Sequence, residues 1–288
     1  MIKREFIPGE SWLYFKLYCG FSSADRILID LYPLCSDLTD KGIIEKWFFI
    51  RYSDPDFHIR VRFLVVQEEN YGFVLKKVNS VLAKFLEIGS ISKVMLDTYS
   101  REVERYSVVF MESSEDVFYA DSVAYLQLLN NISSDSSKEK LRYLFAFKSI
   151  DNYLTNFKYS DSEKLAICEK MRLAYWEEFG INKTTKKFLD DKYRIFAADI
   201  QQIMESCISF PKGIIISDTI QNRTELMNPA IYNILENNKT SNVNIESLIT
   251  SYIHMSINRT FLTRQRQHEL VIYDFLWRYY RSVIARSK

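Results

Sequence analysis

The chain has 288 residues, of which 47% are hydrophobic and 26% charged, the balance of an ordinary soluble globular protein with a sizeable core. Lys and Arg number 38 against 37 Asp and Glu, so a net charge of +1 gives no global attraction to nucleic acid or anionic lipid. Seven glycines and five prolines argue against glycine-rich nucleotide loops and against disorder.

The sequence also predicts no targeting segment and no metal-binding motif. No apolar run approaches the roughly 20 residues of a membrane-spanning helix, and the first residues lack the apolar core of a secretory signal. A cytoplasmic location without a membrane span is therefore expected. No CxxC or HExxH motif occurs, which argues against structural zinc, a redox dithiol or a zinc hydrolase. Four scattered cysteines are expected to be small buried hydrophobes: Cys19, Cys35, Cys168 and Cys207.

Strands are predicted in the first third of the chain. Trp12 to Cys19 alternates between two sets of side chains, which is strand periodicity. Residues 47–52 and 58–66 are predicted to pair as a hairpin, because a proline at the turn 53–56 removes a backbone donor. A fourth strand is expected at residues 94–99.

Helices are predicted between and after these strands. Apolar residues at helical spacing indicate a helix that begins at Ser22 or Ser23 and a second one over residues 74–86. After about residue 115 the pattern is helical almost throughout. Further helices are expected from a capping box at Ser160–Glu163 to Gly180, over 184–208, from an N-cap at Asn244 to Leu262, and from there to about Ile284.

The predicted fold class is α+β. We expect one domain over residues 1–288, in which a small antiparallel sheet within residues 1–112 packs on a mostly helical body over residues 113–288. No internal repeat of fixed period occurs.

The strand that begins at His58 carries the most informative pattern. Side chains alternate along a strand, so His58, Arg60 and Arg62 share one face. Three potential cations in a row repel each other unless that face meets carboxylates or phosphates, which the planar guanidinium binds in a bidentate manner. Taken alone, the pattern rather favours a solvated strand face with ordinary surface arginines.

A late helix carries the candidate base. His254 and Asn258 are i,i+4 neighbours on one helix face. A histidine beside a polar neighbour can be a general base, although a histidine on an apolar helix is more often a packed core residue.

Two other polar segments admit ordinary explanations. Residues 99–106 include Arg105 and are typical of a salt-bridged turn, which contributes little energy. Residues 258–288 hold seven basic side chains with several aromatic ones. They could face a peptide or RNA, or form a terminal helix whose cations complement its dipole.

Taken together, these segments resemble the C-terminal, glutamate-eliminating domain of lantibiotic dehydratases, also called the thiopeptide-type bacteriocin biosynthesis domain. The resemblance extends over nearly the whole chain and rests chiefly on the His-x-Arg-x-Arg hairpin with the late His-Met-x-x-Asn-Arg. The matching segments follow the family's order: Trp12–Tyr18, Trp47–Tyr52 with Asp54-Pro55, His58–Phe63, Tyr99–Tyr106, Ala120–Ser122 and His254–Arg259.

The resemblance implies a lyase. In the family, a glutamylating domain esterifies Ser or Thr of a ribosomal precursor peptide with glutamate from glutamyl-tRNA. The elimination domain then removes the Cα proton and expels glutamate, which leaves dehydroalanine or dehydrobutyrine. Carried over to this sequence, the catalytic positions are His254 as base or proton shuttle, with Arg62 and Arg105 as anion-binding groups. Further substrate contacts are expected from Arg60, His58, Arg51 and Asn258.

The same resemblance implies the partners. They are the glutamylated precursor peptide, a separate tRNA-dependent glutamylating protein and a cyclase, with no direct tRNA binding and no metal or organic cofactor. One departure concerns Ser107-Val108, where the family usually has Gly-Gly, and it affects the backbone beside Arg105. Two alternatives stay open: a pyridine synthase that joins two dehydroalanines by a formal cycloaddition in thiopeptide assembly, and a non-catalytic module that binds the precursor peptide.

Overall fold

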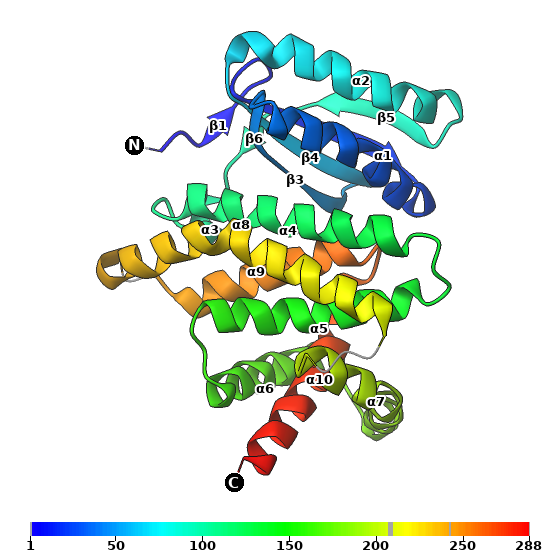
Figure 1. The fold of residues 1–288 in the computed structure, drawn as a ribbon, viewed down its shortest axis with the longest axis vertical. Helices are drawn as coiled ribbons and strands as arrows, with labels where there is room; N and C mark the ends of the chain where they lie inside the picture. Colours follow the sequence, from blue (N-terminus) through cyan, green and yellow to red (C-terminus); the bar gives the residue numbers. More distant parts are fainter. Residues whose placement is uncertain (1, 207–209, 242, 288) are drawn as a thin grey trace. The chain divides into compact units, whose positions relative to one another are not determined.

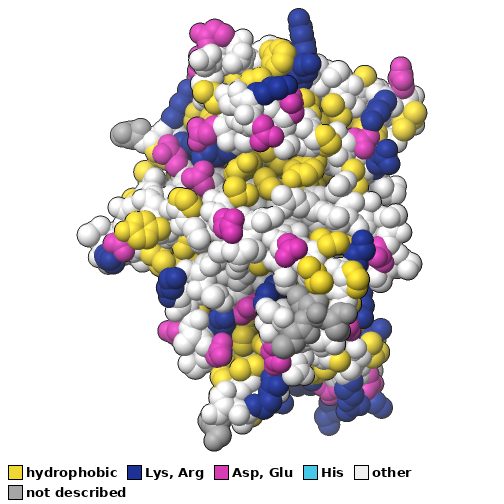
Figure 2. Space-filling model, viewed as in Figure 1, with side chains coloured by type: hydrophobic (Ala, Val, Ile, Leu, Met, Phe, Trp, Pro, Cys, Tyr) yellow, Lys and Arg dark blue, Asp and Glu magenta, His cyan; other side chains and the backbone are white. Residues whose placement is uncertain are grey.

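The computed structural model describes residues 2–206, 210–241 and 243–287. The chain groups into two compact units, which we call the sheet unit, Met1–Asn130 with Leu226–Leu262, and the helical unit, Asn131–Glu225 with Thr263–Lys288. Within the described residues, no helix is long and apolar enough to cross a membrane. Both signs of charge occur among exposed apolar side chains on the face in Figure 2.

The sheet unit is built on a four-stranded antiparallel sheet with the order β3-β4-β2-β5 (Figure 1). Two short strands, β1 and β6, pair separately. The hairpin of β3 and β4 turns at a cis Asp54-Pro55 bond. The strands are β1 (Glu5–Phe6), β2 (Trp12–Cys19), β3 (Ile44–Ser53), β4 (Phe57–Val65), β5 (Ile91–Leu96) and β6 (Tyr99–Ser100).

The two faces of this sheet differ sharply. One face is apolar and fully buried, with Phe15 and Val61 in register on neighbouring strands. Helix α1 (Phe21–Asp40) packs on it, because its Tyr32 ring lies 6.1 Å from the Trp47 ring. The opposite face, which we call the polar face, is assembled by the strand register from Tyr14, Lys16 and Tyr18 of β2, His58, Arg60 and Arg62 of β4, and Phe48, Ile50 and Tyr52 of β3.

Helices complete the sheet unit. Two of them cover the outer edge of β3: the Ser122 hydroxyl of α4 accepts from the Phe49 amide, and Asn258 of α9 bonds the backbone of Arg51. Edge strands need such cover because their backbone groups are otherwise unpaired. The remaining elements are η1 (Glu68–Asn70), α2 (Tyr71–Glu87), α3 (Val103–Tyr106), α4 (Met111–Ile132), the later part of α8 (Pro211–Ser241) and α9 (Ile245–Thr260).

The helical unit contains the remaining helices. Its core includes a buried polar cluster in which Arg172 and Arg278 both bond the carboxylate of Asp274. Helix α6 begins with a capping box between Ser160 and Glu163. The helices are α5 (Lys138–Asn156), α6 (Asp161–Glu178), α7 (Lys183–Met204), the earlier part of α8 and α10 (Gln265–Arg286).

Most predicted elements are confirmed, including the α+β class, the hairpin, the capping box and the Asn244 N-cap. Two local predictions are wrong. The first long helix begins at Phe21 after an N-cap at Gly20 rather than at Ser22 or Ser23. The fourth strand of the sheet ends at Leu96, and residues 99–100 pair instead with β1. Cys35 and Cys168 are buried and Cys19 is half-buried, whereas Cys207 lies outside the described residues.

Candidate functional site

A small hollow lies in the sheet unit, where the polar face meets the α3 segment and helices α4 and α9. Its volume is about 30 Å³, enough for roughly two water-sized groups, and therefore for the two oxygens of a carboxylate. We call it the arginine hollow. Its lining is Phe48, Ile50, Arg62, Tyr99, Ser100, Glu102, Tyr106, Met111, Phe118, Met255 and Arg259.

Arg62 is the most unusual side chain of this hollow. It is only 7% exposed, and its guanidinium carbon lies 4.3 Å from the Tyr14 ring centre and 4.8 Å from that of Tyr99. Burial lowers the pKa of Arg62 below its ordinary value, but a guanidinium stays protonated in proteins. Within the described chain, no carboxylate lies within 4 Å of it. Arg62 is thus a buried cation held by aromatic faces and available to an anion.

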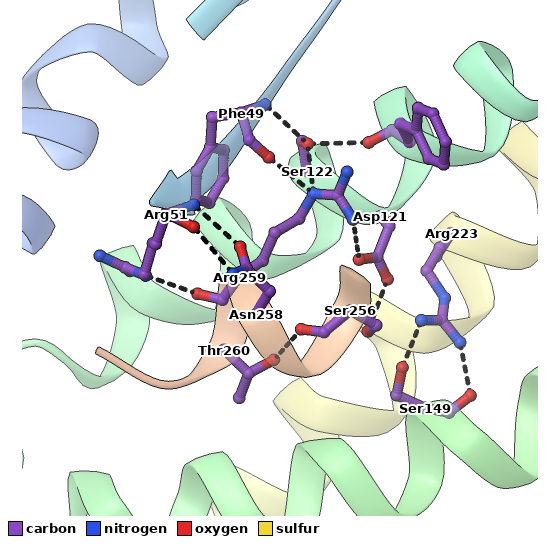
Figure 3. Close-up of polar contacts among 11 residues, drawn as sticks. Phe49, Arg51, Asp121, Ser122, Ser149, Arg223, Ser256, Asn258, Arg259 and Thr260 are labelled. Carbon is purple, nitrogen blue, oxygen red and sulfur yellow. Dashed lines mark hydrogen bonds and ion pairs between the residues drawn. The ribbon is translucent and has the colours of Figure 1, made fainter. Parts of the chain in front are cut away.

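Arg259 is the second guanidinium of the hollow (Figure 3). Its Nε donates to the carbonyl of Phe49 at 2.9 Å and to the Ser122 hydroxyl at 3.1 Å, and its Nη1 lies 3.1 Å from a carboxylate oxygen of Asp121. The Ser256 hydroxyl donates to the other oxygen of that carboxylate at 2.9 Å. These bonds fix the orientation of Arg259, because its anchors lie on two separate elements, strand β3 and helix α4.

Three buried donors of the hollow have no partner among the residues that the structure describes. They are Nε of Arg62, Nη2 of Arg259 and the hydroxyl of Tyr106. Burial raises the pKa of Tyr106 to about 12, so this hydroxyl keeps its proton at neutral pH and can donate. Unpaired buried donors are rare because each costs about 1–3 kcal/mol. Three of them lining one hollow indicate a site for an anionic or strongly hydrogen-bond-accepting group.

Arg105 lies beside this hollow rather than in it. Its Nε donates to the Ser251 hydroxyl on α9 at 3.2 Å, and its Nη1 is 3.8 Å from a carboxylate oxygen of Glu102. Its side chain is 37% exposed. Arg105 is therefore a partly solvated cation at the rim, next to Glu102, which lines the hollow.

His254 shares a helix stripe with residues that face the site. On a helix, positions separated by three or four residues lie on one side, which groups His254 with Ser251 and Asn258, while Met255 lies on the adjacent side. Ser251 bonds Arg105, Met255 lines the hollow and Asn258 bonds β3. His254 is half-buried. The arrangement brings its helix turn to the rim that Arg105 occupies.

Arg60 and His58 form a separate unit on the polar face. The Nε of Arg60 donates to Nε2 of His58 at 3.1 Å, so the His58 proton is on Nδ1, which lies 2.9 Å from the carbonyl of Asp56. Burial lowers the pKa of His58, which favours the neutral ring that this bond requires. The guanidinium of Arg60 also stacks 3.5 Å from the centre of the Tyr52 ring. His58 thus positions Arg60, which does not line the hollow.

Arg51 and Asn258 bond other parts of the fold, although Nη1 of Arg51 is a buried donor without a partner among the described residues. The Asn258 side chain accepts from the Arg51 amide and donates to its carbonyl, both at 2.8 Å. The Arg51 side chain is fully buried, with Nε bonded to the Arg259 carbonyl and Nη2 lying 2.7 Å from Asp25. Both residues therefore join α9 to β3 and fix the position of Arg259 (Figure 3).

Sequence reasoning predicted only Arg62 among the polar members of the hollow. It missed the others as site residues, although they lie in the segments 99–106 and 254–259 that carry the resemblance: Tyr99, Ser100, Glu102, Tyr106 and Arg259. A usable signal was present for Arg259, because an arginine in the apolar helix 245–260 must be paired or functional once it is buried. Ser107, which stands where the family usually has glycine, has a φ of 65°. This backbone conformation favours glycine.

Comparisons with known proteins show the family of the chain. The profile of the family described as "Lantibiotic biosynthesis dehydratase C-term" matches residues 12–280. The subtilin biosynthesis protein SpaB of Bacillus subtilis is 27% identical over 271 residues, which is 89% of this chain and 24% of SpaB. The chain therefore spans about a quarter of the length of that relative.

Two solved structures have a similar fold. The tRNA-dependent lantibiotic dehydratase MibB from Microbispora sp. 107891 matches with a TM-score of 0.76 and 19% identity, over 100% of this chain and 29% of MibB. TbtD, a pyridine synthase from thiomuracin biosynthesis, matches with a TM-score of 0.63 and 11% identity, over 95% of this chain and 100% of TbtD.

Proposed function

The chain belongs to the lantibiotic biosynthesis dehydratase C-terminal family, and from this premise we propose that it eliminates glutamate from glutamylated Ser or Thr of a ribosomal precursor peptide. The proposed products are dehydroalanine or dehydrobutyrine and free glutamate. A separate tRNA-dependent protein supplies the glutamyl ester. The observation that carries this proposal is the cluster of three unpartnered buried donors around the arginine hollow.

The hollow suits the free carboxylate of the glutamyl group. That group carries a negative charge, and Arg62 and Arg259 offer buried positive charge without using all of their donors. Hydrogen bonds to charged groups contribute about 1.5–3 kcal/mol. We propose that Arg62 and Arg259 hold the glutamyl carboxylate, with the Tyr106 hydroxyl as a third donor.

The reaction then needs a base at the rim. We propose that His254 takes the Cα proton of the modified residue. The electron pair of that C–H bond forms the Cα=Cβ double bond as the Cβ–O bond breaks, and glutamate leaves as a carboxylate. Arg105 at the rim would stabilise negative charge on the adjacent carbonyl oxygen, since preorganised cations act most strongly where charge develops. No step in this scheme calls for a metal or an organic cofactor.

The direct test is incubation with a chemically glutamylated peptide, with the product measured by mass. We expect loss of glutamate and formation of a dehydro residue, and no change in the unmodified Ser/Thr peptide even with glutamyl-tRNA, because hydroxide is a poor leaving group. Dehydration of the unmodified peptide by the chain alone would overturn the split arrangement.

A histidine pair gives a matched control for the base. We expect His254→Gln to slow elimination by about 10²-fold, the usual range for a lost general base. His268→Gln makes the same chemical change at a residue of the helical unit that is not part of the site, and it should leave the rate unchanged. An unaltered rate in His254→Gln would remove His254 from the mechanism.

The likeness to TbtD over its whole length favours cycloaddition as the second candidate. A peptide that carries two dehydroalanines distinguishes the two reactions. Conversion of this peptide to a cyclic product, with no elimination from the glutamylated peptide, would replace the lyase by the cycloaddition enzyme. Binding of both peptides without conversion of either would leave only a peptide-binding module.

A further inference from the structure

The polar face of the sheet continues beyond the arginine hollow. Arg62 pairs with Tyr14 near the hollow, whereas His58 pairs with Tyr18 at the opposite end of the same two strands. The Tyr18 ring lies 4.7 Å from the His58 ring, and Nζ of Lys93 lies 5.6 Å from the Tyr18 ring centre. The polar face thus leads from the hollow, past Arg60, to Tyr18.

A second and larger cavity opens at that end. Its volume is about 420 Å³, within the range of about 300–1,000 Å³ that is usual for ligand pockets. We call it the Tyr18 cleft. Its walls come from the end of β2, the β3–β4 turn and the start of β5, and its lining is Tyr18, Cys19, Pro55, Asp56, Phe57, Ser92 and Lys93.

Apolar or aromatic side chains form part of the lining of the Tyr18 cleft, namely Tyr18, Cys19, Pro55 and Phe57, beside the polar Asp56, Ser92 and Lys93. Burial raises the pKa of Cys19 to about 11, so its thiol is uncharged at neutral pH and adds to the apolar wall. The Phe57 ring lies 4.3 Å from the ring of Phe21, which is 45% exposed. Aromatic side chains exposed beside a cavity are typical of a binding surface rather than of a packed core.

Building on the proposed function, we propose that the Tyr18 cleft binds a large apolar or aromatic side chain of the substrate peptide, about four residues from the glutamylated residue. The spacing follows from the strand. The hollow, at whose rim we place the glutamylated residue, lies at the Arg62 end of β4, and the cleft lies at the His58 end. Arg62 and His58 are four residues apart, and a strand rises about 3.4 Å per residue, which gives about 14 Å between the two ends. An extended peptide advances about 3.3–3.6 Å per residue and therefore covers this distance in about four residues.

The stretch between the two cavities fits a peptide backbone. The Arg60 guanidinium is held by His58 and by the Tyr52 ring, and within the described residues its two terminal nitrogens have no partner. They are available to peptide carbonyls that pass from the hollow to the cleft. The nearby cation Lys16 is already paired with Asp97, so Arg60 is the better placed of these two cations for a peptide.

The test uses glutamylated peptides that carry Phe or Ser at positions two to six on either side of the modified residue. We expect the kcat/KM for elimination to favour Phe by at least about tenfold at one position near four, because burying a Phe side chain contributes about 1.5–3 kcal/mol. Ser92→Trp, and separately Lys93→Trp, should fill the cleft and bring this Phe/Ser ratio close to one. Leu96→Trp places the same side chain on the same strand outside the cleft and should keep the ratio.

Binding of fluorescently labelled, unmodified peptides separates this proposal from the reaction itself. A Phe preference in binding that the two filling variants abolish supports the cleft even if no peptide undergoes elimination. Elimination without any positional preference overturns the cleft and leaves the lyase intact. A preference that persists in both filling variants, with their thermal unfolding like that of the wild type, also overturns it.

Discussion

Two arginines that are buried among aromatic rings differ in whether a carboxylate bonds them. Arg172 of the helical unit lies between two indoles, 3.6 Å from the Trp176 ring centre and 3.9 Å from that of Trp277, and bonds Asp274 at 2.8 Å. Arg62 of the sheet unit has a similar aromatic enclosure but, among the described residues, no carboxylate. A buried cation without a counter-ion is costly. We therefore infer that Arg172 stabilises the fold, whereas Arg62 binds a ligand.

The largest effect is expected from removing the carboxylate of the paired cluster. Asp274→Asn leaves two cations, Arg172 and Arg278, without their shared buried partner, and we expect unfolding free energy to fall by about 3–5 kcal/mol. Urea denaturation measures this fall in the free energy of unfolding. Asp190→Asn removes only the half-exposed partner of Arg278 and should cost about 0–1 kcal/mol. If both variants lose the same small amount of unfolding free energy, the bond from Arg172 to Asp274 does not stabilise the fold as we infer.

Replacing Arg62 should affect the rate of elimination strongly and the free energy of unfolding little. Arg62→Met replaces an unpaired buried cation by an apolar side chain of similar length, so we expect unfolding free energy to change by less than about 1 kcal/mol or to increase. Elimination should slow by about 10²–10³-fold, as when one preorganised donor is lost. Normal elimination, or destabilisation as large as that of Asp274→Asn, would refute the ligand role.

Acid should test the cost of adding a charge to a buried group in the helical unit. His268 is bonded to the Tyr143 hydroxyl at 2.7 Å, and burial, with Arg142 and Arg264 adding repulsion, lowers the pKa of His268 to about 4. The unfolded chain binds this proton near pH 6.5, so between pH 6.5 and 4 it holds more protons than the folded chain. Stability should therefore fall as the pH drops through this window, by up to about 3 kcal/mol.

The control for this pH effect is His268→Gln, which cannot gain the charge. The difference between its urea midpoint and that of the wild type should narrow or reverse as the pH falls from 6.5 to 4. Parallel pH profiles for the two proteins would show that the ring at residue 268 is not the group responsible.

The sequence predicted the sheet and its polar face well, because strand alternation is a local property. Placing His58, Arg60 and Arg62 on one face needed only period-two counting, and the register confirms it. The same counting could not separate Arg62 from Arg60. Their difference arises from Tyr99 and Phe48, which reach Arg62 from other strands.

Long-range pairing limits what the site pattern alone can predict. Arg51 and Asn258, predicted as substrate contacts, are 207 residues apart, and the Asn258 side chain bonds the Arg51 backbone; their contact with the substrate stays a prediction. Nothing local to either residue indicates that partner. Arg259 was missed for the same reason, since its anchors at Phe49 and Asp121 come from other parts of the chain. A local pattern identifies chemistry-bearing residues, whereas tertiary contacts decide which of their groups stay available.

The smallest expected effect concerns backbone strain beside the hollow, a second place where the sheet unit gives up stability near its site. Ser107 ends α3 with φ 65° and ψ 145°, a region that is essentially restricted to glycine and costs about 1–3 kcal/mol. Ser107→Gly relieves this strain but adds chain entropy of about 0.5–1 kcal/mol and loses the bond from the Val109 amide to the Ser107 hydroxyl. We expect a net gain in unfolding free energy of about 0.5–1 kcal/mol, measured by urea denaturation.

Ser107→Ala keeps the strain and loses the bond, so it should destabilise by about 1 kcal/mol. Elimination should be unchanged in Ser107→Gly, because the bond from Arg105 to Ser251 does not involve this residue. If glycine proves less stable than alanine here, strain at residue 107 is not a cost of the site.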